Sequence, residues 1–380
     1  MEGAIVNIFG EMCRIVTDSS RGLYIEKGNK ERTVLYGSGV TSFDGVCSRD
    51  GCVHIFTAIE GGILEYIKIT QKDSFKITVS KAKAGADIFD VQVLHLQGRF
   101  HIFYSLKGEE CYLVHQILWE DGIYEPRIID VMHTECEYSA VSDGNSDIHI
   151  VYTAKDKVLT YVRYVYSLKK YTSPVKTPIA DCKSPMLCMC GDRLFTAYTK
   201  KERTFYRAYT ASIPYGFEQK MVCALSKNDA IAVCGNTDSL KLHFVQGDTC
   251  YEVTWFLDGT FPKEKRVGKT KGIYKIISFE KTFKYPVDRN YSPIGDYAVA
   301  LKGLESNEKK YVSLKEEMED FSTKGMADFE RKAFLMFKEE TEKRLAKLES
   351  DLGKIIDMYI NDTKTASCEY TETTEGGMEE

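Results

Sequence analysis

The stretch VHIFT at residues 53–57 decides the fold, because its short, mainly apolar pattern returns four times along the chain. The other copies are FHIFY (100–104), IHIVY (148–152), LFTAY (194–198) and LKLHF (240–244). Their starts are 47, 48, 46 and 46 residues apart. A fixed period of this length indicates a repeat architecture.

Two further sets of aromatic residues follow each copy at similar distances. The first set marks a Tyr-rich strand and consists of Tyr66, Tyr112, Tyr161, Tyr206 and Tyr251. The second set is expected near the turn between the third and fourth strands and consists of Phe75, Tyr124, Tyr171, Phe217 and Phe261. The apolar pattern and the two aromatic sets keep similar spacing in all five copies, so a chance origin of the repeat is a poor explanation.

Each copy is also preceded by another short apolar strand and by a turn rich in Gly, Asp and Asn. Such turns are SRDG (48–51), SDGNSD (142–147) and GNTDS (235–239), and they are typical of β-hairpins. The repeat unit is therefore four antiparallel strands without a helix, which is the unit of a propeller blade. Strict repetition argues against a β-sandwich, in which each strand has an individual position.

The number of blades depends on the two ends of the repeat region. Strand-rich sequence begins at Ala4 and makes one degenerate blade before the five clear copies. After the fifth copy, GIYKIISF (272–279), TFKYPV (282–287) and DYAVALK (296–302) could complete a further blade. We therefore predict an all-β propeller of seven four-stranded blades. The alternative is six blades, with the last strands closing the ring or extending it.

The composition changes near Gly303, which divides the chain into a propeller (1–303) and a C-terminal segment. We predict a linker at 304–325, a long amphipathic helix at 326–362 and a disordered acidic tail at 363–380. The helix contains no proline, and its apolar residues Leu345, Leu348, Leu352, Ile355 and Tyr359 follow the 3,4 spacing of a coiled coil.

This spacing covers little more than two heptads, and Phe334 lies in a second apolar cluster, AFLMF (333–337). A helix of this kind needs packing to be stable. We expect it to self-associate or bind a protein partner through Phe334 and the five heptad residues, with docking on its own propeller as the alternative.

Charge and composition restrict the function classes. The formal net charge is −5, and the tail from Thr363 to Glu380 carries five acids against one base, so the body is nearly neutral. A nearly neutral body disfavours nucleic-acid binding. We find neither a signal peptide nor a membrane-spanning run and expect a cytoplasmic protein with reduced cysteines.

Three groups of residues resemble functional motifs. His54, His101 and His149 occupy one repeat position, and we interpret them as side chains packed between blades. Cys182, Cys188 and Cys190 lack the paired spacing of a zinc site. VGKTKG (267–272) lacks the first glycine of a phosphate-binding loop. We therefore predict no catalytic, cofactor or metal residues.

The repeats resemble those of known propeller families. The repeat length and the IHIVY-type strand are similar to those of six-bladed fucose-binding lectins, whose sugar sites use recurring Arg, Glu and aromatic residues between blades. Arg163 and Arg207 are candidates for one such position, which the other copies do not repeat. SDGNSDIHI (142–150) resembles the Asp box of sialidase-like propellers but has a different spacing and lacks the Trp.

These observations predict a non-enzymatic interaction scaffold, with a binding face on the propeller and a helix for oligomerisation or partner contact. The alternative is a carbohydrate-binding propeller. A propeller glycoside hydrolase or lyase is a third reading, and it requires paired carboxylates that converge on one site.

Overall fold

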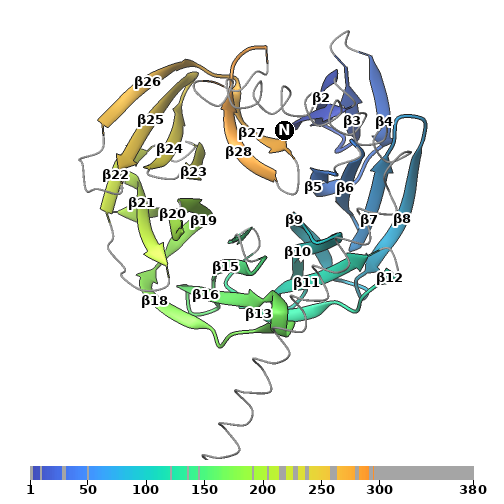
Figure 1. Ribbon diagram of the computed structural model, residues 1–380, viewed down its shortest axis with the longest axis horizontal. Coiled ribbons are helices and arrows are strands. Elements are labelled where there is room, and N and C mark those ends of the chain that lie inside the picture. Colours follow the sequence, from blue (N-terminus) through green and yellow to red (C-terminus); the bar gives the residue numbers. More distant parts are fainter. Residues whose placement is uncertain are drawn as a thin grey trace, which may run out of the picture. The chain divides into compact units, whose positions relative to one another are not determined.

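Each copy of the VHIFT-type pattern forms the second strand of an antiparallel sheet, and the sheets are arranged around a ring as the blades of a propeller (Figure 1). The computed structural model describes residues 3–290 and Ile294. The gaps within this range are 9–10, 28–30, 49–50, 120–121, 135–136, 144–145, 191, 203–204, 214–219, 226–229, 236–238, 257–262, 279–281 and 291–293. The predicted linker (304–325), helix (326–362) and tail (363–380) lie outside the described residues.

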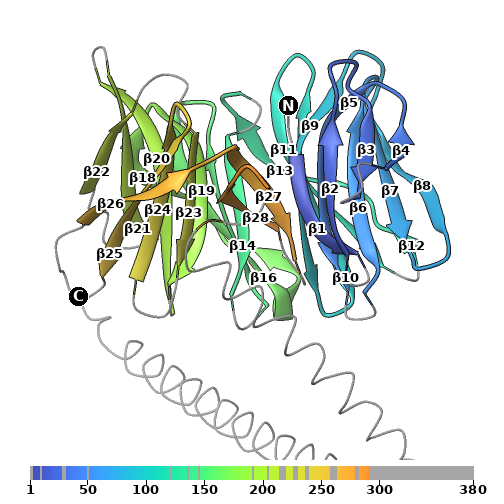
Figure 2. The ribbon, with the colours of Figure 1, turned by 90° about the horizontal axis from the view of Figure 1, so that it is seen from above.

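Six blades follow one another in chain order, and within each blade the strands run from the inner to the outer edge (Figures 1 and 2). Blade 1 consists of β1 (Gly3–Ile8), β2 (Glu11–Thr17), β3 (Leu23–Glu26) and β4 (Arg32–Tyr36). Blade 2 consists of β5 (Val40–Cys47), β6 (Val53–Ile59), β7 (Ile63–Ile69) and β8 (Ser74–Lys81). Blade 3 consists of β9 (Asp87–Leu96), β10 (Arg99–Lys107), β11 (Cys111–Trp119), β12 (Gly122–Ile123) and β13 (Arg127–Met132).

Blades 4 to 6 follow the same plan. Blade 4 consists of β14 (Tyr138–Ser142), β15 (Ile148–Thr153), β16 (Val158–Val165), the 3-10 turn η1 (Tyr166–Leu168), β17 (Lys170–Tyr171) and β18 (Val175–Ala180). Blade 5 consists of β19 (Cys182–Cys190), β20 (Arg193–Glu202), β21 (Phe205–Ile213) and β22 (Lys220–Leu225). Blade 6 consists of β23 (Ala230–Gly235), β24 (Ser239–Gln246), β25 (Thr249–Phe256) and β26 (Lys263–Lys269). The outer strands of blades 3 and 4 are each divided into two pieces.

The preferred prediction of seven blades is wrong, and the six-bladed alternative is confirmed. The hairpin of β27 (Gly272–Ile277) and β28 (Thr282–Val287) joins blade 1, because β27 pairs in parallel with the inner edge of β1. This pairing and the burial of Tyr285 and Val287 use the hairpin to close the ring instead of starting a new sheet. The hairpin contacts the inner strands of blades 2, 3 and 6.

Apolar packing between blades forms the core. Six clusters of buried side chains each connect neighbouring blades, or the closing hairpin with its neighbours. Between blades 2 and 3, for example, Phe56 and Ile102 pack in one cluster and are both fully buried. Each such side chain contributes about 1.5–3 kcal/mol of transfer free energy, which explains why the second strands are apolar on both faces.

A hydrogen bond from the inner strand also repeats between blades. Asp44 Oδ2 accepts from the backbone N–H of Val93 at 2.9 Å. The equivalent positions, Gln92 and Ser139, accept from the next blade in the same way. The distances are 3.1 Å for Gln92 with Ala140 and 3.0 Å for Ser139 with Leu187. These bonds fix the rotation of blades 2 to 5 relative to one another.

Gly235 at the end of β23 allows blades 5 and 6 to approach closely. A Cβ atom at this position would lie 1.9 Å from the carbonyl oxygen of Met189 on β19. This contact is far shorter than any side-chain contact, so the position requires glycine because of its neighbour and not because of its own backbone dihedrals.

Candidate functional site

Paired polar side chains recur at two positions of the blade, one on the second strand and one on the third. In blades 2, 3 and 4 a ring nitrogen of His54, His101 or His149 faces the third-strand partner. The distances are 2.6 Å for His54–Tyr66, 3.0 Å for His101–His115 and 2.8 Å for His149–Tyr161. Blade 6 has an ion pair at these positions, with 3.6 Å between Lys241 Nζ and Glu252 Oε1.

A third polar position, at or just after the end of the first strand, lies near these pairs, and we call the three positions together the polar array. Six residues before each histidine lie Ser48, His95 and Asp143. Ser48 Oγ lies 2.8 Å from His54 Nε2, and Asp143 Oδ2 lies 3.2 Å from His149 Nε2. Both ring nitrogens of these two buried histidines are therefore engaged within their own blade.

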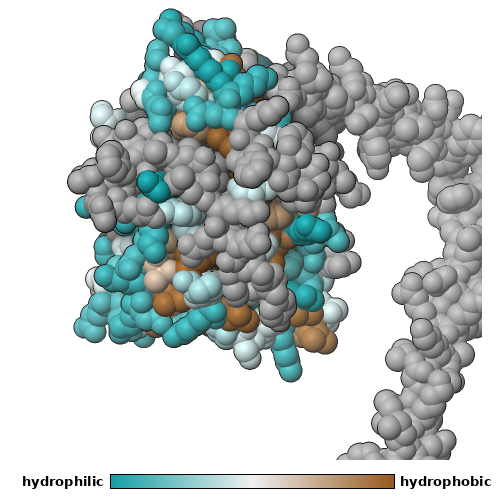
Figure 3. Space-filling model, turned by 90° about the vertical axis from the view of Figure 1, so that its left-hand side faces the viewer, coloured by the Kyte–Doolittle hydropathy of each residue, from teal (hydrophilic) through white to brown (hydrophobic). Residues whose placement is uncertain are grey.

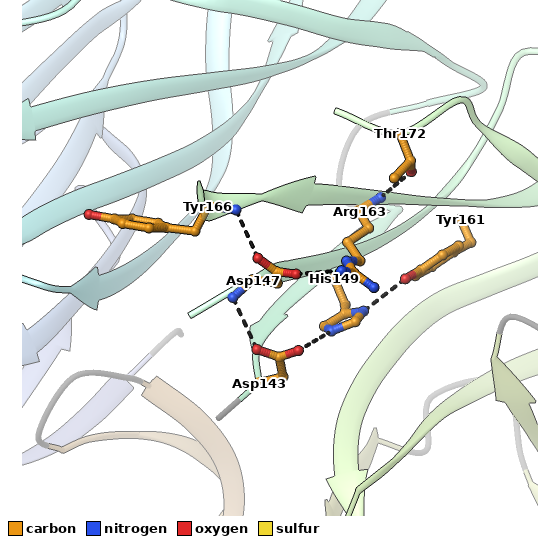
Figure 4. A network of polar contacts seen from close by, with 7 residues as sticks. All are labelled: Asp143, Asp147, His149, Tyr161, Arg163, Tyr166 and Thr172. Atoms are coloured by element: carbon orange, nitrogen blue, oxygen red, sulfur yellow. Dashed lines mark hydrogen bonds and ion pairs between the residues drawn. The ribbon is translucent and has the colours of Figure 1, made fainter. Parts of the chain in front are cut away.

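Blade 4 extends the array into a network that reaches the surface (Figure 4). Asp143 accepts from the backbone N–H of Asp147 at 3.0 Å, and Asp147 in turn forms a 2.7 Å ion pair with Arg163. Asp147 also accepts from the N–H of Tyr166 at 2.8 Å, while the Tyr166 ring points away from the network. The network thus holds the β14–β15 turn, β16 and η1 together.

The side chain of Arg163 is 42% exposed, whereas that of its ion-pair partner Asp147 is 8% exposed. Its backbone N–H donates to Thr172 Oγ1 at 3.1 Å, which aligns β16 with the outer part of the blade. Asp147 fixes the guanidinium from one side, so the exposed side can donate to a further acceptor. This is a preorganised donor, and it is not the geometry of an acid–base pair.

The histidine pair of blade 3 is buried against blade 4. His115 stacks on Phe103 with 4.5 Å between ring centroids and bonds to the hydroxyl of Tyr171. Burial lowers the pKa of His101 to about 3 and lowers the pKa of His115 well below its usual value. Both rings are therefore neutral at pH 7 and pack as part of the interface between blades.

The polar group of blade 6 faces the closing hairpin. His243 lies 3.1 Å from Glu252 Oε2 and 4.8 Å, between ring centroids, from Tyr285 of β28. The hydrogen bond from His243 lowers the pKa of Glu252 to about 2, so this carboxylate is ionised at neutral pH. Lys241, His243 and the hydroxyl of Thr254 all contact this carboxylate and compensate its burial, as a buried carboxylate requires.

The three neighbouring cysteines do not form a metal site. Cys182, Cys188 and Cys190 are buried thiols, and Cys190 Sγ lies 3.1 Å from the carbonyl oxygen of Ser239. Burial raises the pKa of the Cys188 thiol well above its usual value. No group of three His, Cys, Asp or Glu residues within the described ranges could hold a metal ion.

Other candidates from the sequence have different outcomes. VGKTKG (267–272) spans the end of β26 and the start of β27, so it lacks the strand–loop–helix context of a phosphate-binding loop, as expected. The predicted interaction residues of the C-terminal helix lie outside the described residues: Phe334, Leu345, Leu348, Leu352, Ile355 and Tyr359. No helix in the described part of the chain is long and apolar enough to span a membrane.

Strand register corrects the Tyr-rich anchor of the repeat. Tyr66 and Tyr161 pair with Phe56 and Val151, two residues after the array histidines. The equivalent third-strand residues of the other blades are His115, Thr210 and Glu252, and not Tyr112, Tyr206 and Tyr251. Loops of different length between the second and third strands cause the error, because counting along the chain does not preserve cross-strand register.

The same register separates the two arginine candidates. Arg163 pairs with His149, whereas Arg207 pairs with Lys200, so they do not share a blade position. Sequence reasoning therefore missed the third-strand members of the array. Counting outward from the second strand across each hairpin would have found them.

Comparisons with known proteins agree with this architecture. The BP39L lectin from Burkholderia pseudomallei has a TM-score of 0.51 at 11% identity, covering 70% of this chain and 83% of that chain. A PL25 ulvan lyase bound to -[GlcA(1-4)Rha3S]- has a TM-score of 0.53 at 9% identity, covering 75% and 91%. Trypanosoma rangeli sialidase has a TM-score of 0.47 at 8% identity, covering 83% and 62%.

The chain is a generic β-propeller. No family model matches it, and no curated protein matches it. The BP39L lectin and the ulvan lyase share its fold, and identities this low show the fold alone.

Proposed function

We propose that this protein is a non-enzymatic interaction scaffold whose binding face is the outer rim of blades 1 to 4. One observation carries the proposal. Of the eight exposed large hydrophobic side chains among the described residues, seven lie on the outer strands of these blades or on the turns beside them. We call these seven the apolar rim: Val34, Phe75, Ile77, Ile123, Tyr124, Ile128 and Leu168.

Exposed apolar side chains scattered singly are ordinary, but their concentration on one part of a surface indicates an interaction site. Figure 3 shows the side of the molecule where β22 and β26 lie. Among its coloured residues, hydrophilic ones lie at the top and along the lower left, and hydrophobic ones show below the centre and at the bottom.

The state of the histidines supports a non-catalytic role. A general base must lie within hydrogen-bond reach of the proton that it removes, and His54, His101, His115 and His149 are all buried. His54 and His149 use both nitrogens within their own blades, and His115 bonds to His101 and Tyr171. Asp143 and Asp147, the paired acids of blade 4, are likewise occupied by His149, Arg163 and backbone N–H groups.

Site-specific photo-crosslinking in the native cell tests the scaffold function. A benzophenone amino acid replaces Phe75, Ile128 or Leu168 in the full chain, and the matched control replaces Lys265, which is exposed on β26. We expect the rim positions to capture a common protein partner and the control position to capture none of it. Capture of nothing at all three rim positions would reject the proposal.

A second candidate function is carbohydrate binding, and the Arg163–Asp147 pair favours it. An exposed guanidinium held by a carboxylate presents directed donors beside an acceptor, which suits adjacent sugar hydroxyls. A glycan array probed with the full chain tests this function. Binding that disappears in Arg163→Ala would support a lectin, and an array without signal would reject it.

The C-terminal segment adds a second interaction element to the proposal. We expect the predicted helix at 326–362 to oligomerise the chain or bind a partner, and we propose the cytoplasm as its compartment. Linking several propellers would raise their avidity for a repeated partner without new contacts.

A further inference from the structure

The outer strand of blade 2 is built differently from the other outer strands. β8 (Ser74–Lys81) has eight residues and is the longest outer strand in the described part of the chain. It is a single strand whose one register shift lies near its end, between Thr78 and Ser80; it contains no proline, and its first five residues are all exposed. Its partner within the described residues is β7, so its other edge is the edge of the sheet.

The two faces of β8 have different environments. Lys76 points toward blade 1, where its Nζ donates to the carbonyl oxygen of Leu35 at 3.2 Å and lies 3.4 Å from the ring centroid of Tyr36. Phe75 and Ile77 lie on the opposite face, which is turned toward blade 3, and are 49% and 38% exposed. Successive side chains of a strand point to opposite faces of the sheet, so Lys76 lies on one face of β8 and Phe75 and Ile77 lie on the other.

Blade 3 continues the apolar surface next to β8. The side-chain amide of Gln116 donates to the carbonyl oxygen of Val79 at 3.4 Å and to that of Tyr124 at 3.0 Å, so β8 and the segment after β12 lie side by side. Figures 1 and 2 both place β12 beside β8. Phe75 and Ile77 on β8, together with Ile123 and Tyr124 on the neighbouring segment, are exposed apolar side chains, and we call these four the apolar patch.

The charge around this patch selects its partner. Between Gln71 and Lys83 the chain carries four lysines and one aspartate, and Lys72, Lys81 and Lys83 are exposed. A second copy of β8 would place lysines opposite lysines, which disfavours self-pairing. An extended segment with acidic and apolar residues in alternation would meet the lysines and the patch together.

We propose that β8 binds an extended, acidic and apolar segment of a partner protein as an added strand. Backbone groups of β8 pair with the segment, the apolar side chains of the segment cover Phe75 and Ile77, and its carboxylates face the lysines. This inference rests on the scaffold function and names the chemistry of one partner segment.

A labelled octapeptide that alternates glutamate and valine is the probe, and fluorescence anisotropy with the full-length protein is the measurement. We expect saturable binding that weakens as salt rises. Peptides with lysine or proline in place of glutamate should bind at least tenfold more weakly. Hydrogen exchange should show new protection within Ser74–Lys81.

Variants of the full chain complete the test. Ile77→Asp should weaken peptide binding at least tenfold, and Lys72→Glu should weaken it severalfold. Lys265→Glu, a matched charge reversal on β26, should leave it unchanged. Equal binding to Ile77→Asp, equal binding of the lysine peptide, or protection on another strand would each overturn the proposal.

Two further outcomes separate this proposal from the scaffold function. If the peptide does not bind while crosslinkers at positions 128 or 168 still capture a partner, then the β8 proposal is wrong and the scaffold function stands. If Ile77→Asp converts a sedimenting dimer into a monomer, then a second copy occupies the edge and the proposal is also wrong.

Discussion

The Nδ1 atom of His149 lies 2.8 Å from the hydroxyl oxygen of Tyr161, and this pair joins the second and third strands of blade 4. The same relationship joins His54 and Tyr66 in blade 2, at 2.6 Å. We expect Tyr161→Phe to lower the free energy of unfolding by about 1–2 kcal/mol, because it removes one buried hydrogen bond and leaves a ring nitrogen unsatisfied. Urea unfolding measures the change.

Two variants serve as comparisons for this prediction. Tyr66→Phe should cost a similar amount, because its hydroxyl has the same role two blades away. Tyr124→Phe, at an exposed tyrosine, should change stability by less than about 0.5 kcal/mol. Equal effects of all three substitutions would contradict the structural role of the array.

The buried histidine pair predicts a specific dependence of stability on pH. The pKa values of His101 and His115 are lowered in the folded state, so only the unfolded state binds protons at these sites just below pH 6.5. Their stabilising contribution is complete above that pH and is lost as the pH falls. Each site changes the free energy of unfolding by about 1.4 kcal/mol per pH unit below that pH.

The variant His101→Gln isolates this effect from the titration of carboxylates. Between pH 6 and pH 4.5, we expect the free energy of unfolding of this variant to fall less steeply with pH than that of the wild type. The difference between the two slopes should correspond to the uptake of close to one proton on unfolding. The titratable groups that face His101, namely Arg99, His95 and His115, are all kept in this variant. Parallel curves for the two proteins would show that His101 is not buried in its neutral form.

The close approach of blades 5 and 6 at Gly235 predicts a large effect of a small change. Gly235→Ala places a methyl group against the Met189 carbonyl oxygen and should destabilise the fold by at least about 2 kcal/mol. Gly37→Ala is the matched control, because no atom lies within 4 Å of its added Cβ and its backbone dihedral is ordinary. Thermal unfolding of both variants should show a loss for Gly235→Ala alone.

The propeller fold and most of its blades could be predicted from the sequence, because the second strand of each blade carries the same recurring apolar pattern. VHIFT and its copies each occupy the same strand of a blade, and the glycine-rich turns mark the hairpins. The blade number did not follow, because GIYKIISF reads as an ordinary first strand. Its parallel pairing with Ala4 to Val6 is a contact between residues about 270 positions apart, which no local pattern records.

The polar array was predicted only in part for a related reason. His54, His101 and His149 lie within the repeated stretch and were therefore visible. Their partners are different residue types, Tyr66, His115 and Tyr161, and they follow loops of different length. The exposure of the outer-strand side chains was not readable either, because it depends on what packs against each strand.

The predicted C-terminal helix gives an independent test of the scaffold. In the full-length protein, the double variant Leu345→Asp, Leu352→Asp places two charges in the predicted heptad seam. We expect sedimentation velocity to show an oligomer for the wild type and a monomer for the variant, with the propeller still folded by circular dichroism. A monomeric wild type would remove oligomerisation from the proposal.

Quantitative affinity purification from the native cell tests the central claim most directly. The full-length wild type is compared with Phe75→Ser, Ile128→Ser, Leu168→Ser, a triple variant of the apolar rim, and with Lys265→Ser as the surface control. We predict that the triple variant loses at least nine-tenths of a partner that the wild type and the control both recover. Full recovery of every partner by a folded triple variant would contradict the assignment of the rim as the binding face.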